Sequence, residues 1–273
     1  NLSIKGTGKI QLEKDFDQID YFISKTDDKV NFDSNIKLSE LKIKNQKNIQ
    51  KNIKTFFPEI EETINLKDHQ VNIKFKDDNL SIKGTGKIQL EKDFDQIDYF
   101  ISKTDDKVNF DSNFITNRTT FQINKINFKK NKGSKLKLII SGNYEKNKEL
   151  ILDQFVISTK ENNIKLKNLL INKYRKIVKF DEINLDYFDS ENKRNKLTLK
   201  RVQKNNYELN GSIFNANKLI TDLLKSKDDK HSRIFKNNLN LNLNLDKVYI
   251  DDNNVVKNLK GNFYIEDNKI NQA

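Results

Sequence analysis

The chain has 273 residues, of which 35% are hydrophobic and 33% charged, with a formal net charge of +12. It contains no cysteine, which excludes disulfides, thiolate nucleophiles and cysteine-based zinc sites. The 18 Phe and 8 Tyr exclude simple disorder, and the sequence has no apolar run of about 18 residues that would span a membrane. It has no methionine, even at position 1, so we expect a piece of a longer protein.

The positive charge has two readings. It suits a polyanion such as nucleic acid or an acidic membrane surface, or it follows from an A/T-rich genome, whose codons favour Lys, Asn, Ile and Phe. The lysines are spread along the chain between Asp and Glu, as on solvated strand faces. Aromatic residues such as Phe32, Phe75 and Phe263 fall in the apolar phase rather than on a base-stacking platform. We therefore favour the second reading and expect no nucleic-acid partner.

An internal duplication is the first organisational feature. Residues 1–35 and 79–113 are identical, and both read NLSIKGTGKIQLEKDFDQIDYFISKTDDKVNFDSN. Perfect identity indicates a recent duplication, a constructed chain or a sequence-assembly error. A stacked or extended sheet tolerates such an insertion, because each unit contacts mainly its neighbours. We expect the same strands in both copies, within one elongated β-repeat domain over 1–273.

Apolar and polar residues alternate over most of the chain, which is typical of half-buried β-strands. The first such face contains Leu2, Ile4, Gly6, Gly8, Ile10 and Leu12. The alternation recurs at 71–75, 183–187 and 207–213, and it is clearest at 239–245. Its phase slips at Lys125 and after Leu245, which suggests β-bulges.

Polar turn sequences separate the expected strands at 26–28, 76–79, 131–134 and 251–254. Short turns between successive strands indicate an antiparallel meander, and strict alternation indicates one wet face. The predicted fold class is all-β: an elongated, curved antiparallel sheet, groove-like and repeat-built, with one or two short helices.

The two expected helices lie at 45–60 and 217–225. Helical spacing relates Ile49, Ile53, Phe56, Phe57 and Ile60, with Pro58 limiting the helix. It also relates Leu219, Ile220, Leu223 and Leu224, with Asn217 as the expected cap. Both helices either plug an edge or end of the sheet, which we favour, or form a gate or partner contact.

The sequence shows no motif that is typical of a catalytic or metal-binding site. His69 and His231 lie in polar, turn-like sequence without a metal-ligand spacing, so we expect solvated loop histidines. Gly6 and Gly8 lie in mid-strand and lack the Lys-Ser/Thr end of a phosphate loop, so they mark a bulge or a close backbone approach. We expect no enzyme, no cofactor, no catalytic residue and no metal site.

The C-terminal third has a more specific order of segments. It reads YELNGSI at 207–213, NANKLITDLL at 215–224, NLNLNLNLDKVYI at 238–250 and VVKNLKGNF at 255–263. This order resembles the AsmA-like family, and within it the YhdP and TamB group. Their repeat joins a strand, a Leu-Ile-x-x-Leu-Leu helix, a long alternating strand and an x-x-Leu-x-Gly-x-hydrophobic segment. The likeness is best over 196–273, and 49–63, with Phe56-Phe57-Pro58, is similar to the helix–proline linkers of that group.

The resemblance implies a periplasmic protein of a Gram-negative envelope, anchored in the inner membrane by a helix outside this sequence. It implies a bridge-like protein that carries phospholipid between inner and outer membranes along an apolar β-groove, with phospholipid acyl chains as partners. The expected groove-lining residues are Leu209, Ile213, Leu239, Leu241, Leu243, Leu245 and Phe263.

Physical chemistry leaves two ways to cover such a face. A sheet with one apolar face must bury that face against something. Lipid chains can cover it, at a gain of about 0.8 kcal/mol per buried CH₂. Alternatively a second sheet covers it, and the chain is a structural or adhesive β-repeat protein with a dry core and no transported ligand.

Overall fold

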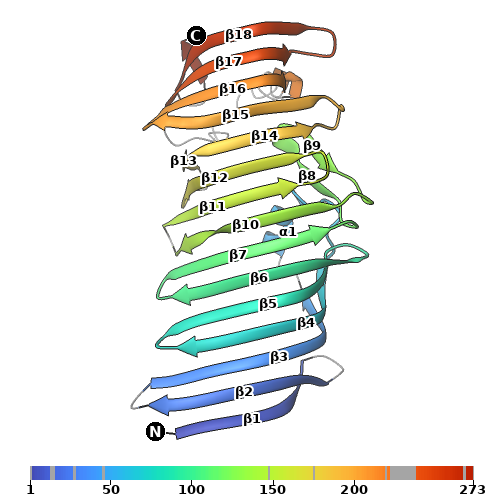
Figure 1. The fold of residues 1–273 in the computed structure, drawn as a ribbon, viewed down its shortest axis with the longest axis vertical. Helices are drawn as coiled ribbons and strands as arrows, with labels where there is room; N and C mark the ends of the chain where they lie inside the picture. The colour runs from blue at the N-terminus through green and yellow to red at the C-terminus, as the bar shows by residue number, and fades with distance from the viewer. Residues whose placement is uncertain are drawn as a thin grey trace. The chain divides into compact units, whose positions relative to one another are not determined.

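The structure is a computed structural model that describes residues 2–12, 16–26, 29–44, 47–146, 148–174, 176–218, 220–221, 238–266 and 269–272. Contacts group the chain into two compact units. Unit 1 comprises 1–121 and 130–146, and unit 2 comprises 122–129 and 147–273. Each unit contains its own run of paired strands (Figure 1). The prediction of one repeat domain over 1–273 stays a prediction.

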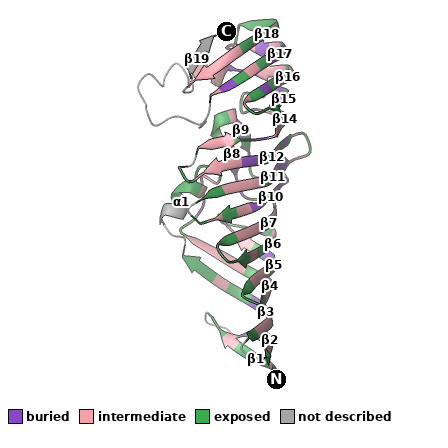
Figure 2. Cartoon of the chain, turned by 90° about the vertical axis from the view of Figure 1, so that its left-hand side faces the viewer, coloured by how far each residue is buried: buried purple, intermediate pink, exposed green. Residues whose placement is uncertain are grey.

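Unit 1 is an antiparallel meander in which each strand pairs with the next one along the chain. Its strands are β1 (Leu2–Gln11), β2 (Phe16–Thr26), β3 (Lys29–Lys44), β4 (Thr63–Lys76), β5 (Asn79–Gln89), β6 (Phe94–Thr104) and β7 (Lys107–Thr116). β10 (Leu136–Glu145) then pairs with β7. The helix α1 (Lys47–Ile53) separates β3 from β4 and lies to one side of the sheet (Figure 2).

Unit 2 is mainly antiparallel as well. Its strands are β11 (Glu149–Ser158), β12 (Asn163–Asn172), β13 (Ile177–Lys179), β14 (Glu182–Phe188), β15 (Arg194–Gln203), β16 (Asn206–Asn215), β17 (Leu239–Tyr249), β18 (Val255–Glu266) and β19 (Lys269–Gln272). β16 and β17 pair in parallel, because the long connection at 216–238 lets the chain return in the same direction. The all-β prediction is confirmed. The described strands depart from a simple meander in this parallel pair, in the pairing of β12 with β14 as well as β13, and in β8 (Phe121–Ile123) and β9 (Phe128–Lys130), which form a separate two-stranded sheet between β7 and β10 in the chain.

The two identical segments form the same strands in the same register. Gly6 pairs with Tyr21 across β1 and β2, and Gly84 pairs with Tyr99 across β5 and β6. A Cβ atom on either glycine would lie within 3 Å of the tyrosine ring, so the ring covers the glycine in each copy. Gly6 and Gly84 therefore mark the close approach of a side chain rather than of backbone, whereas a Cβ atom on Gly8 would make only an ordinary contact with Ile19, at 3.8 Å.

Turn residues explain the tight connections. The loop between β4 and β5 consists of Asp77 and Asp78, which have φ angles of 48° and 62°. Two positive φ angles define the type I′ turn, whose twist matches that of the adjoining strands. The turns expected at 76–79, 131–134 and 251–254 all lie between strands. Residues 27–28 of the turn at 26–28 lie outside the described residues.

Three local expectations need correction. Around Lys125 the chain forms a short 3₁₀ turn, Asn124–Ile126, between β8 (Phe121–Ile123) and β9 (Phe128–Lys130), rather than a bulge. The first helix ends at Ile53, so 54–60 is irregular. At the second helix Asn215, not Asn217, accepts the capping bond, since its Oδ1 lies 3.3 Å from the Asn217 backbone nitrogen. Residues 217–218 and 220–221 are helical, and 222–225 lie outside the described residues.

Candidate lipid-binding faces

The leucines of β17 share one face of unit 2, and the asparagines between them are exposed. The parallel and antiparallel neighbours of β17 continue this face. Tyr207, Leu241 and Phe263 lie side by side across β16, β17 and β18. Leu209 and Leu243 form the next pair, and Gly211, Leu245 and Leu259 form the row after it. The structure thus brings six of the seven expected residues onto one apolar face: Leu209, Leu239, Leu241, Leu243, Leu245 and Phe263.

Ile213 does not join these rows. A register shift between β15 and β16 places it opposite Lys196, whereas Gly211 lies opposite Leu197. An extra residue in one strand turns the side chains that follow it to the other face. This shift depends on the partner strand, so the sequence of β16 alone could not locate it.

Much of the leucine face is closed by unit 2 itself. Leu239, Leu243 and Leu245 are all buried, and Leu245 is only 2% exposed. Leu239 belongs to a cluster with Leu169 of β12, Phe180 and Tyr207, in which the Phe180 and Tyr207 rings lie 4.7 Å apart. This end of the face is therefore a core rather than an open trough.

Two hollows of unit 2, of about 510 and 410 Å³, lie over the β16–β18 region. The residues that line both are Glu208, Asn242 and Asn262, which are exposed residues of the asparagine-rich face. Amide and carboxylate groups favour water over an acyl chain. The smaller hollow is therefore mainly polar, whereas the larger one is also lined by Tyr207, Leu241 and Phe263 of the apolar rows.

Unit 1 carries an apolar face that is much less covered. One row across its strands is Tyr21, Ser34, Ile73, Ile82, Ile101 and Phe110, and the next is Ile19, Ile36, Val71, Gly84, Tyr99 and Ser112. The hydrophobic members of both rows are half-buried, apart from Ile101, which is 37% exposed. Figure 2 accordingly shows β1–β7 mainly in the colours of half-buried and exposed residues. We predicted no groove residues here from the sequence, although the same alternation is present at 71–75.

The segment after α1 covers only one end of this face. Phe57 contacts Phe114 and Phe121, with ring centroids 5.9 and 5.2 Å away, and Ile60 is buried. The most buried apolar residues of unit 1, Phe121 and Leu136, lie at this same end. The irregular segment after α1 thus plugs one end of the sheet, the role that we favoured from the sequence for the first helix. The same interpretation of the second helix stays a prediction.

Beneath the plug lies a buried polar cluster. Asp95 accepts hydrogen bonds from the hydroxyls of Thr116, at 2.7 Å, and Thr119. Lys130 donates to the Thr119 carbonyl at 2.7 Å, and burial lowers the pKa of its ammonium group. The Asp95 carboxylate and the Lys130 ammonium group are both bonded to residues of the loop at 116–119. These hydrogen bonds therefore hold that loop in place.

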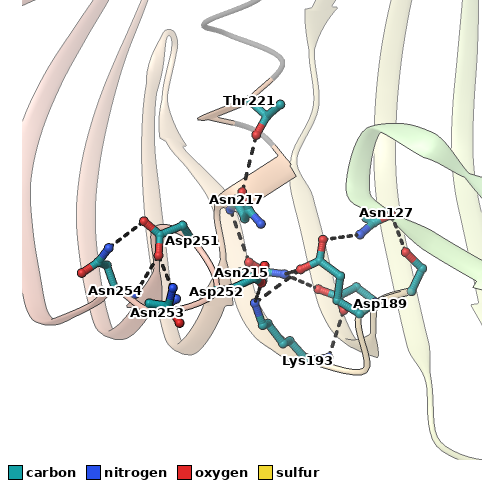
Figure 3. A network of polar contacts seen from close by, with 12 residues as sticks. Asn127, Asp189, Lys193, Asn215, Asn217, Thr221, Asp251, Asp252, Asn253 and Asn254 are labelled. Carbon is teal, nitrogen blue, oxygen red and sulfur yellow. Dashed lines mark hydrogen bonds and ion pairs between the residues drawn. The ribbon is translucent and has the colours of Figure 1, made fainter.

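Unit 2 has a comparable network, shown in Figure 3. The Asp189 carboxylate accepts bonds from the backbone of Glu191 and Lys193 and from the amides of Asn195 and Asn215. Hydrogen bonding to Asp252 raises the pKa of Lys193. These bonds join the β14–β15 turn to the end of β16, where the crossover to β17 begins.

His69 corrects another expectation. It lies within β4 rather than in a solvated loop, and its side chain is 0% exposed. An extra residue in β4, at Asp68 with φ 49°, turns the ring onto Gly86 of β5. Burial lowers the pKa of His69, and neither ring nitrogen has a hydrogen bond of good geometry. His231 lies outside the described residues.

Within the described ranges there is neither a metal-ligand cluster nor a helix able to span a membrane. No group of three or more His, Asp or Glu side chains is arranged to hold a metal ion there. Of the helices described, none combines the length and apolar character that crossing a membrane requires. Comparison with family models, curated proteins and solved structures found no match.

Proposed function

We propose that this chain is part of a bridge-like lipid-transport protein that moves phospholipid between the inner and outer membranes of a bacterial envelope. One observation carries the proposal: among the residues that the structure describes, the apolar face of β2–β7 in unit 1 is covered at the end where Phe57 and Ile60 pack and is half-buried or exposed beyond it. Soluble proteins rarely leave such a face open, and an open face of this kind marks an interaction site.

Acyl chains fit the chemistry of this face. Its rows consist of Ile, Val, Phe and Tyr side chains, with isolated serines such as Ser34 and Ser112. Burial of acyl chains there is favourable by about 0.8 kcal/mol per CH₂ and needs no directed polar contact. The opposite face bears lysines and would stay in water. On this proposal the protein is periplasmic, its membrane anchor lies outside these residues, and it is not an enzyme.

The second candidate is a structural or adhesive β-repeat protein. The closed cluster of unit 2 around Leu239 and Phe180 favours it, because a covered face has no room for a transported ligand. The two candidates therefore draw on different units: the open face of unit 1 and the closed cluster of unit 2.

Mass spectrometry of lipids that remain bound to the purified full chain tests the proposal. We expect phospholipid to co-purify with wild type and to be lost in Ile101→Asp, which places a charge on the open face. Gln96→Glu is the matched control, since it adds the same charge on the exposed side of the same strand. Equal lipid in all three proteins, or none in wild type, would reject the proposal.

A further inference from the structure

The asparagine-rich face of unit 2 lies on the side of the sheet opposite to the leucines of β17. Nine of its residues border the two hollows and form three rows across β16, β17 and β18: Asn206, Asn240 and Tyr264; Glu208, Asn242 and Asn262; and Asn210, Asn244 and Lys260. The middle row borders both hollows, so the two meet there. We call this surface the amide groove, and from Asn206 to Asn210 it extends along the strands for about 13 Å.

Most amide groups of the groove are available to a ligand. Asn240 Nδ2 donates to Asn206 Oδ1 at 2.8 Å, so these two side chains hold each other. The other asparagines of the groove are exposed, and their side chains form no hydrogen bond with other described residues: Asn210, Asn242, Asn244 and Asn262. β16 and β17 each have a paired strand on both sides, so these amides lie on a face of the sheet rather than at an edge. Each free amide offers two N–H donors and a carbonyl acceptor.

An aromatic ring stands at one end of the groove. Tyr264 lies opposite Asn240 and therefore belongs to the asparagine face, although its neighbour Phe263 lies with the leucines. The Tyr264 hydroxyl accepts a hydrogen bond from Asn238 Nδ2 at 3.1 Å, which holds the ring in place. A tyrosine ring offers a flat apolar surface beside polar groups. The groove thus combines a ring with many amides, which fits the flat apolar face and the polar edge of a sugar.

The charge and size of the groove narrow the ligand further. Among the described residues that line the hollows, the charged ones are Glu208 and Lys260. A phosphate chain needs several lysines or arginines to neutralise it, and here it would meet the Glu208 carboxylate in the middle row. An acetamido group suits the asparagines, because it donates its N–H to one amide oxygen and accepts from an amide nitrogen. Volumes of about 510 and 410 Å³ are typical of small-ligand sites.

We infer that the amide groove binds an uncharged oligosaccharide that carries acetamido groups. This function goes beyond the proposed lipid transport and rests on unit 2 alone. One sugar ring lies against Tyr264, and the hydroxyl and acetamido groups of the next sugars bond to Asn242 and Asn262. Each such bond replaces a bond to water and contributes modestly, so several are needed. The run of asparagines along the groove provides them.

The probe is chitotetraose, an uncharged chain of N-acetylglucosamine, titrated into the full chain by isothermal titration calorimetry. We expect saturable binding of one oligosaccharide per chain. Cellotetraose has the same linkage but no acetamido groups, so it should bind at least about tenfold more weakly. Oligothymidylate, which carries phosphates, should bind more weakly than chitotetraose. Absence of chitotetraose binding, equal binding of cellotetraose, or tighter binding of oligothymidylate would each overturn the inference.

Two variants place the sugar in the groove. Asn242→Val removes an amide of the middle row and should weaken chitotetraose binding at least about tenfold, and Tyr264→Val should do the same by removing the ring. Asn242 is exposed, so its substitution should not prevent folding. Asn163→Val is the matched control, since Asn163 is an exposed asparagine of β12 that lines neither hollow, and it should leave binding unchanged. Binding that Asn242→Val does not change, or that Asn163→Val weakens equally, would overturn the inference by placing the sugar elsewhere.

Discussion

The His69 ring lies directly over Gly86, the residue opposite the bulge in β4. A Cβ atom at Gly86 would lie 2.7 Å from the backbone Cα of His69 and closer still to its ring. Two features that looked unrelated in the sequence, a mid-strand glycine and a histidine in polar surroundings, therefore form one packing unit.

Alanine at Gly86 should consequently destabilise unit 1 by about 1–3 kcal/mol, the usual cost of overpacking. Gly8→Ala is the matched control, because the same residues flank it in the chain and its Cβ would make only an ordinary contact. Urea unfolding of both variants measures the difference. Equal destabilisation by the two alanines would contradict the packing described for His69.

The buried state of His69 makes unit 1 sensitive to acid. Burial lowers the pKa of the folded-state imidazole below its ordinary 6.5, so below that pH the unfolded chain binds more protons. Stability should therefore fall as the pH drops from about 6.5 toward 5, by at most about 1.4 kcal/mol per pH unit. His69→Phe should flatten the dependence in this window when unfolding is followed at several pH values. An unchanged slope would show that His69 does not cause it.

On the leucine face of unit 2, Leu243→Asp should unfold the unit or destabilise it by about 3–5 kcal/mol. Leu243 is buried, and a carboxylate there would be desolvated without a partner. Asn242→Asp places the same charge on the exposed side and should change stability by less than about 0.5 kcal/mol. Thermal unfolding separates the two. A stable Leu243→Asp variant would mean that this face is open.

The hydrogen bonds that the Asp189 carboxylate accepts should be required for the stability of unit 2. Asp189→Ala removes the acceptor of two buried amides, those of Asn195 and Asn215, and should cost about 2 kcal/mol or more. Asp252→Ala removes only an exposed partner of Lys193 and should cost less than about 1 kcal/mol. Amide hydrogen exchange within unit 2, measured across a denaturant series, gives the two costs. Equal costs for the two variants would show that the bonds to Asp189 are unimportant.

Local patterns were sufficient to predict the strands and their wet faces. The alternation of Leu and Asn in 239–245 gives both the strand and the exposure of Asn240, Asn242 and Asn244. The turn at Asp77 and Asp78 was also recognisable, since these residue types tolerate positive φ.

Features that depend on a distant partner were not predictable in this way. The burial of His69 follows from a one-residue bulge opposite Gly86, and the position of Ile213 follows from a shift against Lys196. The parallel pairing of β16 with β17 depends on where a long connection returns. Each is a matter of register between strands, which a single strand's sequence does not specify.

Photo-crosslinking to phospholipid from two phenylalanine positions of unit 1 tests the central claim most directly. Phe110 lies on the open apolar face beside Ile101, and Phe100 lies on the opposite face, between Lys83 and Asp111. With benzoylphenylalanine at one position at a time in the full chain, and phospholipid vesicles present, we expect lipid adducts from Phe110 and few or none from Phe100. Equal labelling at the two positions, or labelling at Phe100 alone, would contradict a lipid path along this face.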